Sequence, residues 1–142
     1  MTTETKIIEN ITHDGNVIAI IIRNEYTYEG IKFLSQEDFS LQIGYMSRPQ
    51  GYKVIPHIHN PVKRNTIGTQ EVLFIKKGRI RIDFYSYEQN YLESRELAAG
   101  DVIFLIGAGH GIDFIEPSEI FEVKNGPYIE GADKGRFEGL HK

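Results

Sequence analysis

The feature that most constrains this chain is a succession of short segments with the two-residue alternation of β-strands, without any long segment of helical spacing. Residues 79–85 show it most clearly, because Ile80, Ile82 and Phe84 alternate with charged residues. Successive side chains of a strand point to opposite faces, so this pattern indicates one buried and one exposed face. Several such strands separated by turns predict an all-β sandwich or barrel.

Other strands are expected where apolar runs end at turns that contain glycine or proline. These runs are residues 17–23, 41–46, 71–75, 102–106 and 120–124. We expect residues 71–75 and 79–85 to form a hairpin around Gly78. Residues 26–39 are the one segment where a short helix is expected.

Length and composition predict a single domain over residues 1–142, with a core over about 17–128 and a C-terminal tail over 129–142. The chain has no cysteine, which excludes disulfides, thiolate metal ligands and cysteine nucleophiles, and fits a cytoplasmic location. Its net charge of −4 argues against a nucleic-acid partner. No apolar run approaches the roughly 20 residues of a membrane span, and no secretory signal is apparent.

Two histidines that are separated by one residue give the first indication of a site. In a strand, His57 and His59 would project from the same face. Neutral imidazole is a common protein ligand for Zn, Fe, Ni and Cu. Taken alone, this spacing is a weak signal that favours two half-buried polar residues on a strand, so the surrounding residues decide between the two interpretations.

These surroundings resemble the two sequence motifs of the cupin superfamily, which are small β-barrels of the jelly-roll type. The first motif is similar to G-(x)5-H-x-H-(x)n-E-(x)6-G and is matched by Gly51, His57, His59, Glu71 and Gly78. The second, a Gly-Asp strand that leads to a single histidine, is matched by Gly100, Asp101 and His110. The resemblance covers about residues 51–124 and implies a single cupin-type jelly-roll β-barrel.

The sequence departs from the family pattern in both motifs. Eleven residues, 60–70, separate His59 from Glu71, where the motif has a much shorter gap, so Glu71 is placed by its distance from Gly78. In the second motif Ile106 replaces the usual proline, Phe114 replaces the usual asparagine, and His110 comes one residue early. A cupin barrel that binds no metal therefore remains an alternative.

The resemblance implies that His57, His59, Glu71 and His110 bind one divalent transition metal ion, such as Fe, Mn, Ni, Co or Zn. Three imidazoles and one carboxylate suit such an ion and leave positions open for a substrate. Residues 106–128 also resemble a subgroup of small cupins that are associated with sugar and polysaccharide metabolism. The resemblance thus implies an enzyme with isomerase- or epimerase-like chemistry on a small anionic or sugar-like substrate. A dioxygenase and a non-catalytic sugar or effector binding module are alternatives, and a homodimer is expected from the family.

Positive charge is concentrated around the expected ligands. Residues 48–82 contain eight basic residues and one acidic residue, a net charge of +7 in a chain of −4. Such a region attracts a carboxylate or phosphate. Lys63 and Arg64, in the insertion, are therefore candidate substrate contacts, whereas Arg79 and Arg81 alternate with apolar residues and are expected on the outer face.

Three further residues are candidates near the site. Glu122 and Lys124 would share one face of a strand and could supply a general acid and base. An exposed cross-strand pair of small energetic value is the alternative for these two. Tyr128, after Gly126-Pro127, could line the barrel mouth or be an ordinary packed tyrosine.

Overall fold

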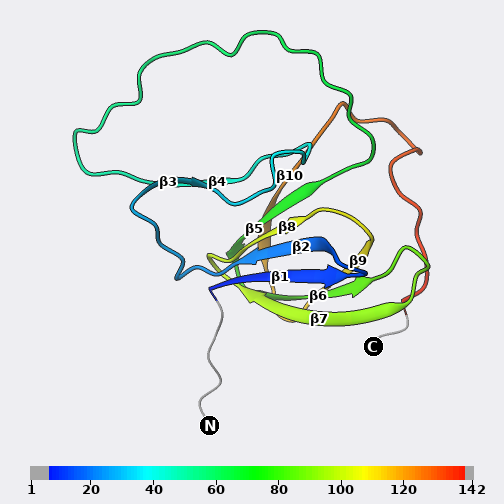
Figure 1. Ribbon diagram of the computed structural model, residues 1–142. Coiled ribbons are helices and arrows are strands. Elements are labelled where there is room, and N and C mark those ends of the chain that lie inside the picture. The colour runs from blue at the N-terminus through cyan, green and yellow to red at the C-terminus, as the bar shows by residue number, and fades with distance from the viewer. Residues whose placement is uncertain (1–6, 140–142) are drawn as a thin grey trace.

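The computed structural model describes residues 7–139, which form ten strands and no helix (Figure 1). The strands are β1 (Ile8–His13), β2 (Asn16–Ile22), β3 (Gly30–Phe33), β4 (Gly44–Ser47), β5 (Glu71–Lys77), β6 (Arg79–Tyr85), β7 (Tyr91–Ala98), β8 (Val102–Leu105), β9 (Gly109–Phe114) and β10 (Glu119–Lys124). They make a five-stranded sheet in the order β1-β2-β8-β5-β10, a three-stranded sheet in the order β7-β6-β9, and the hairpin β3-β4. The all-β class is confirmed, and the sheets stay separate rather than closing on one another. Within residues 7–139 no helix could cross a membrane.

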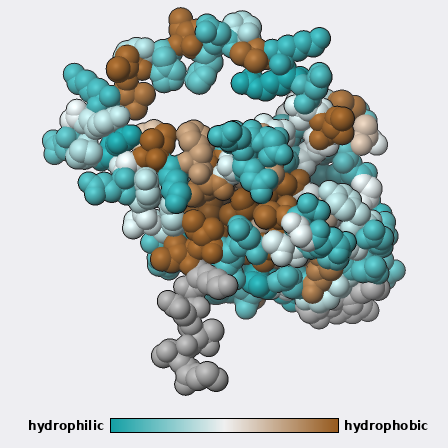
Figure 2. Space-filling view, viewed as in Figure 1, coloured by the Kyte–Doolittle hydropathy of each residue, from teal (hydrophilic) through white to brown (hydrophobic). Residues whose placement is uncertain are grey.

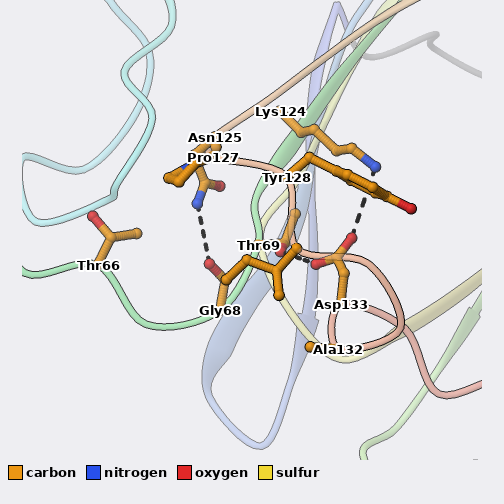
Figure 3. Close-up of a pocket in the computed structure, with 11 residues that line it drawn as sticks. Thr66, Gly68, Thr69, Lys124, Asn125, Pro127, Tyr128, Ala132 and Asp133 are labelled. Atoms are coloured by element: carbon orange, nitrogen blue, oxygen red, sulfur yellow. Dashed lines mark hydrogen bonds and ion pairs between the residues drawn. The ribbon is translucent and has the colours of Figure 1, made fainter.

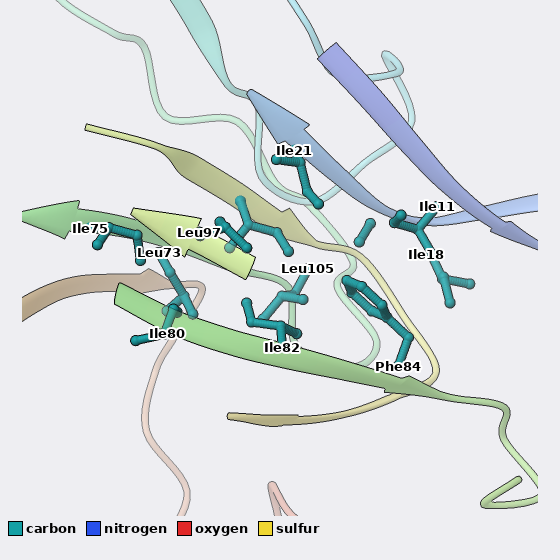
Figure 4. Close-up of a cluster of buried hydrophobic side chains, with 12 residues drawn as sticks. Ile11, Ile18, Ile21, Leu73, Ile75, Ile80, Ile82, Phe84, Leu97 and Leu105 are labelled. Carbon is teal, nitrogen blue, oxygen red and sulfur yellow. The ribbon is translucent and has the colours of Figure 1, made fainter. Parts of the chain in front are cut away.

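The five-stranded and three-stranded sheets pack face to face through aliphatic side chains (Figure 4). Ile80 and Ile82 of β6 have no exposed surface, and they share one cluster with Leu73 and Ile75 of β5. Burial of each such side chain stabilises the fold by about 1.5–3 kcal/mol relative to exposure. The burial predicted for Ile80, Ile82 and Phe84 is confirmed, whereas Asp83, on the face expected to be exposed, is also buried.

A second apolar cluster covers the outer face of the five-stranded sheet. Phe104 is fully buried there beneath Phe39 and Leu41. The helix expected over residues 26–39 is wrong, because this segment lies extended over the sheet and contains β3. The side-chain amide of Gln42 donates to the carbonyl oxygens of residues 36, 37 and 39, which removes the need for helical hydrogen bonds. Of the strand expected over residues 41–46, only residues 44–46 are in a strand, as part of β4.

Gly78 is a corner between the two large sheets and not the turn of a hairpin. β5 pairs with β8 and β10, whereas β6 pairs with β7 and β9, so the predicted hairpin of residues 71–75 with 79–85 is wrong. The φ of Gly78 is +89°, and a Cβ there would lie 2.2 Å from Ser118 Oγ and 2.5 Å from the Pro117 carbonyl oxygen. This conformation sends consecutive strands into opposite sheets, so that their apolar faces meet across the core.

Gly100 and Asp101, which match the second motif, form a buried corner before β8. The Asp101 carboxylate accepts hydrogen bonds from the backbone N–H groups of Asn24 (2.8 Å) and Ala98 (2.9 Å). It also pairs with Arg23 at 3.2 Å. These contacts join the ends of three strands, so this Gly-Asp pair has a structural role.

Strands are confirmed within one or two residues at 17–23, 71–75, 102–106 and 120–124, whereas β1, β7 and β9 were not expected. Of the tail expected over 129–142, residues 140–142 lie outside the described part. The rest of the tail returns to the sheets, where the Phe137 ring lies 5.1 Å from that of Tyr85. The tail therefore covers one end of the three-stranded sheet.

We expect Gly78→Ala to lower the free energy of unfolding by about 1–3 kcal/mol more than Gly15→Ala, measured by urea denaturation. Both glycines have positive φ, which costs an alanine about 1–2 kcal/mol. A Cβ at Gly15 meets nothing within 4 Å, so that variant isolates the conformational cost. Equal losses would show that the close approach at Gly78 has no energetic consequence.

We expect Asp101→Ala to cost about 3 kcal/mol of stability, because it removes a buried carboxylate that pairs with Arg23 and accepts hydrogen bonds from two part-buried backbone N–H groups. Chemical denaturation would measure this change. Glu88→Ala is the control, since Glu88 is an exposed acidic residue in the β6–β7 turn. A loss no greater than in the control would contradict the structural role of Asp101.

Candidate functional site

Glu71 and His110 meet at a cavity of about 590 Å³. Glu71 is the first residue of β5 in the five-stranded sheet, and His110 belongs to β9 in the three-stranded sheet. The distance from Glu71 Oε2 to His110 Nε2 is 3.8 Å. Tyr85 and Phe137 contribute apolar surface to the same cavity. Two of the four residues predicted as metal ligands are therefore neighbours, although 39 positions separate them in sequence (110 − 71).

The electrostatic environment of this pair favours neutral side chains. Burial, together with a hydrogen bond to Glu122, raises the pKa of Glu71 to about 7. Burial lowers the pKa of His110, which keeps its imidazole neutral near pH 7. The positive charge of Lys134 lowers both pKa values. A neutral imidazole has a free lone pair, which is the state that binds a metal ion or accepts a proton.

Glu122 and Lys124 lie on β10, next to β5. Their register partners are Leu73 and Glu71, so both side chains lie on the face of the sheet that carries Glu71. Glu122 is exposed, and Lys124 forms an ion pair with Asp133 at 3.7 Å. The structure thus places the two candidate acid–base residues beside the Glu71–His110 pair.

A smaller cavity of about 300 Å³ lies between the end of β10 and the residues before β5 (Figure 3). The Thr69 hydroxyl donates to Asp133, and both residues line the two cavities. Asn125 accepts a hydrogen bond from the Gln70 N–H at 2.7 Å and donates to the Gly68 carbonyl oxygen at 3.1 Å. Tyr128, a candidate substrate contact, lines this smaller cavity and is largely exposed.

His57 and His59 lie in a different part of the molecule. Residues 48–70, which we call the arch, connect β4 to β5 without a strand and stand away from the sheets (Figures 1 and 2). The two imidazole rings are 5.1 Å apart. The Nδ1 of His57 donates to the Ile55 carbonyl oxygen at 2.8 Å, which leaves Nε2 of the neutral ring free to bind a metal ion.

The arch also carries the two basic residues predicted to contact substrate. Lys63 and Arg64 are exposed. Arg64 lines a shallow cavity of about 710 Å³ together with Glu37 and Asp38. This cavity shares no lining residue with the one that contains Glu71 and His110.

The predicted ligands therefore form two pairs, Glu71 with His110 and His57 with His59. Among residues 7–139 no three histidine, aspartate or glutamate side chains lie close enough to hold a metal ion. The side chains of each pair are of a type that binds a metal ion, but within one chain the two pairs lie too far apart to share an ion. Lys134 was missed by sequence reasoning, because a lysine in a polar tail gives no signal of the cavity that it faces.

Comparison with known proteins adds no family to this description. No family model matches the chain, and neither a curated protein nor a solved structure does. The capabilities of the site therefore follow from its own geometry and charge.

Asn125→Ala should release the end of the arch that precedes β5. We expect the Gln70 amide to exchange its hydrogen about tenfold faster, because one hydrogen bond worth about 1–1.5 kcal/mol is lost. Hydrogen exchange followed by mass spectrometry or NMR would measure this. Asn90→Ala, in an exposed turn, should leave Gln70 unchanged. The same rate in both variants would show that Asn125 does not hold this segment.

Proposed function

We propose that this chain is a cupin-type jelly-roll protein whose His57, His59, Glu71 and His110 bind one divalent transition metal ion. We further propose that it is an enzyme that acts on a small anionic or sugar-like molecule. The observation that carries the proposal is the 3.8 Å approach of Glu71 to His110 across two sheets. The sequence motifs had selected these two residues independently of any structure.

Several properties of the cavity support the binding of a metal ion and a small anion. The His110 imidazole is held neutral by burial, as ligation requires. Lys134 and Arg136 line the same cavity and would attract a carboxylate or phosphate group. A bound metal ion would polarise a substrate oxygen and stabilise negative charge on it.

Isomerase-like chemistry is the reaction class that we favour. Isomerisation moves a proton between two positions of the substrate, which requires a group that can hold and release it. With Glu71 bound to the metal ion as a carboxylate, Glu122 and Lys124 on the neighbouring strand β10 would be the groups that hold and release this proton. Glu122, which is exposed, is the residue of this group that can exchange a proton with a substrate.

Metal content tests the proposal. We expect the full chain, incubated separately with Mn, Fe(II), Co, Ni or Zn and then desalted, to retain about one ion of at least one of these metals per chain. Retention should fall at least about tenfold in His110→Ala and in the double variant His57→Ala/His59→Ala, because each removes ligands. Elemental analysis by mass spectrometry measures the ratio.

His13→Ala is the matched control, because His13 ends β1 and lies beside Asp14 in a turn rather than at the cavity. This variant should keep the metal content of the wild type. The proposal would be wrong if the wild type, the ligand variants and the control all retained the same negligible amount. Circular dichroism of each variant separates a lost ligand from a lost fold.

A further inference from the structure

β9 is an edge strand whose inner face lacks cover. It pairs with β6 on one side, and no described strand pairs with its other side. Its register partners Ile80 and Ile82 are fully buried, whereas Phe114 and Ile112, directly opposite them, are 59% and 36% exposed. These two residues lie on the same inner face, so the sandwich is open along β9. An unpaired edge with apolar inner residues is a site where another strand can add.

The arch has the complementary property. No described strand pairs with any part of residues 48–70, although the segment is rich in β-branched apolar residues. Ile55 is 82% exposed and Ile67 is 99% exposed, and Figure 2 shows open space between the arch and the rest of the molecule. The arch has 23 residues (70 − 48 + 1). Exposure of its apolar side chains to water is unfavourable, and a surface that covered them would stabilise the segment.

Charge also matches the arch to the body of the protein. The arch contains four basic residues and no acidic residue, a charge of +4. The remaining sequence contains 12 basic and 20 acidic residues, a charge of −8. Residues 109–139, which include β9 and β10, contain seven acidic and three basic residues, a charge of −4. Electrostatic attraction therefore directs the arch toward this side of a body.

We infer that the arch of each chain adds as a strand to the free edge of β9 in a second copy, reciprocally, so that two copies form a dimer. With His57 antiparallel and opposite His110, Ile55 lies opposite Ile112, and the imidazoles face the cavity. Pro56, which has no N–H, then points its nitrogen to solvent, as an edge strand requires. Each cavity is completed by His57 and His59 of the other copy, and this last step rests on the proposed function.

A second copy fits these observations better than folding of the arch onto its own body. One end of the arch is held at Gly68 and Gln70 by Asn125, and the other continues from β4 in the hairpin β3-β4. Between these ends it stands clear of its own sheets (Figure 1). Every copy then has both an unpaired strand-like segment and an unpaired edge, and a two-fold axis satisfies both at once. Each copy would contribute the edge of β9 and much of its 23-residue arch, which approaches the roughly 20–30 residues per side of a stable interface.

Oligomeric state tests the docking without reference to metal. We expect the full chain to sediment as a dimer of 16.3 kDa chains in analytical ultracentrifugation. Ile55→Asp should weaken the dimer at least about tenfold, because it sets a carboxylate against Ile112. The control Phe33→Asp changes an exposed apolar side chain (59%) of β3 that belongs to neither the arch nor β9, and it should leave the dimer unchanged. A wild-type monomer, or equal dissociation constants for the two variants, would overturn the inference.

Complementation tests whether the histidines act in the other copy. Chains with His110→Ala and chains with His57→Ala/His59→Ala should each retain little metal when pure. Co-expressed in equal amounts, they should recover about a quarter of the wild-type content, since about half of the dimers are mixed and one of their two cavities is intact. No recovery from mixed dimers, with a wild type that binds metal, would overturn the exchange. A dimeric wild type that binds no metal would overturn the proposed function. The docking of the arch on β9 would then be decided by the effect of Ile55→Asp on the dimer.

Discussion

The aliphatic contact between β5 and β6, on either side of Gly78, determines where everything else in this molecule lies. Because the glycine turns the chain out of one sheet and into the other, Leu73 and Ile75 before it pack in one core cluster with Ile80 and Ile82 after it. Glu71, the first residue of β5, and Tyr85, the last residue of β6, line the same cavity. The register of β6 with β9 then sets His110 beside Phe84. The meeting of Glu71 with His110 thus follows from one corner and one strand register.

The pattern of alternation predicted that Ile80, Ile82 and Phe84 are buried, because it depends on the pleat of a strand alone, but it did not predict the burial of Asp83 on the opposite face. It did not predict the partners of β5 and β6. A glycine between two alternating segments is equally compatible with a hairpin and with a corner between sheets. The close approach of Pro117 and Ser118 to Gly78, about forty residues later in sequence, is part of what makes this one a corner. Local sequence does not contain that information.

Other misses have similar causes. β9 contains two glycines among six residues, and glycine disfavours strands, so its sequence gave no strand signal. It is a strand because all six of its residues pair with residues of β6 in an antiparallel ladder. The spacing of His57 and His59, by contrast, suits a strand, but the structure shows no strand at these residues. Their chemistry was predicted from sequence, and their surroundings could not be.

The long gap between His59 and Glu71 connects these points. If a few residues separated the two, as in the family motif, the histidines would stay within reach of the glutamate of their own chain. Eleven residues in extended conformation span up to about 36 Å, which is the scale of a small domain. Glu71 and Gln70 are held to the body by β-pairing and by Asn125, so this length is available to carry the histidines outward. This long gap keeps the two histidines away from the glutamate of their own chain. The same gap allows two chains to build one site together.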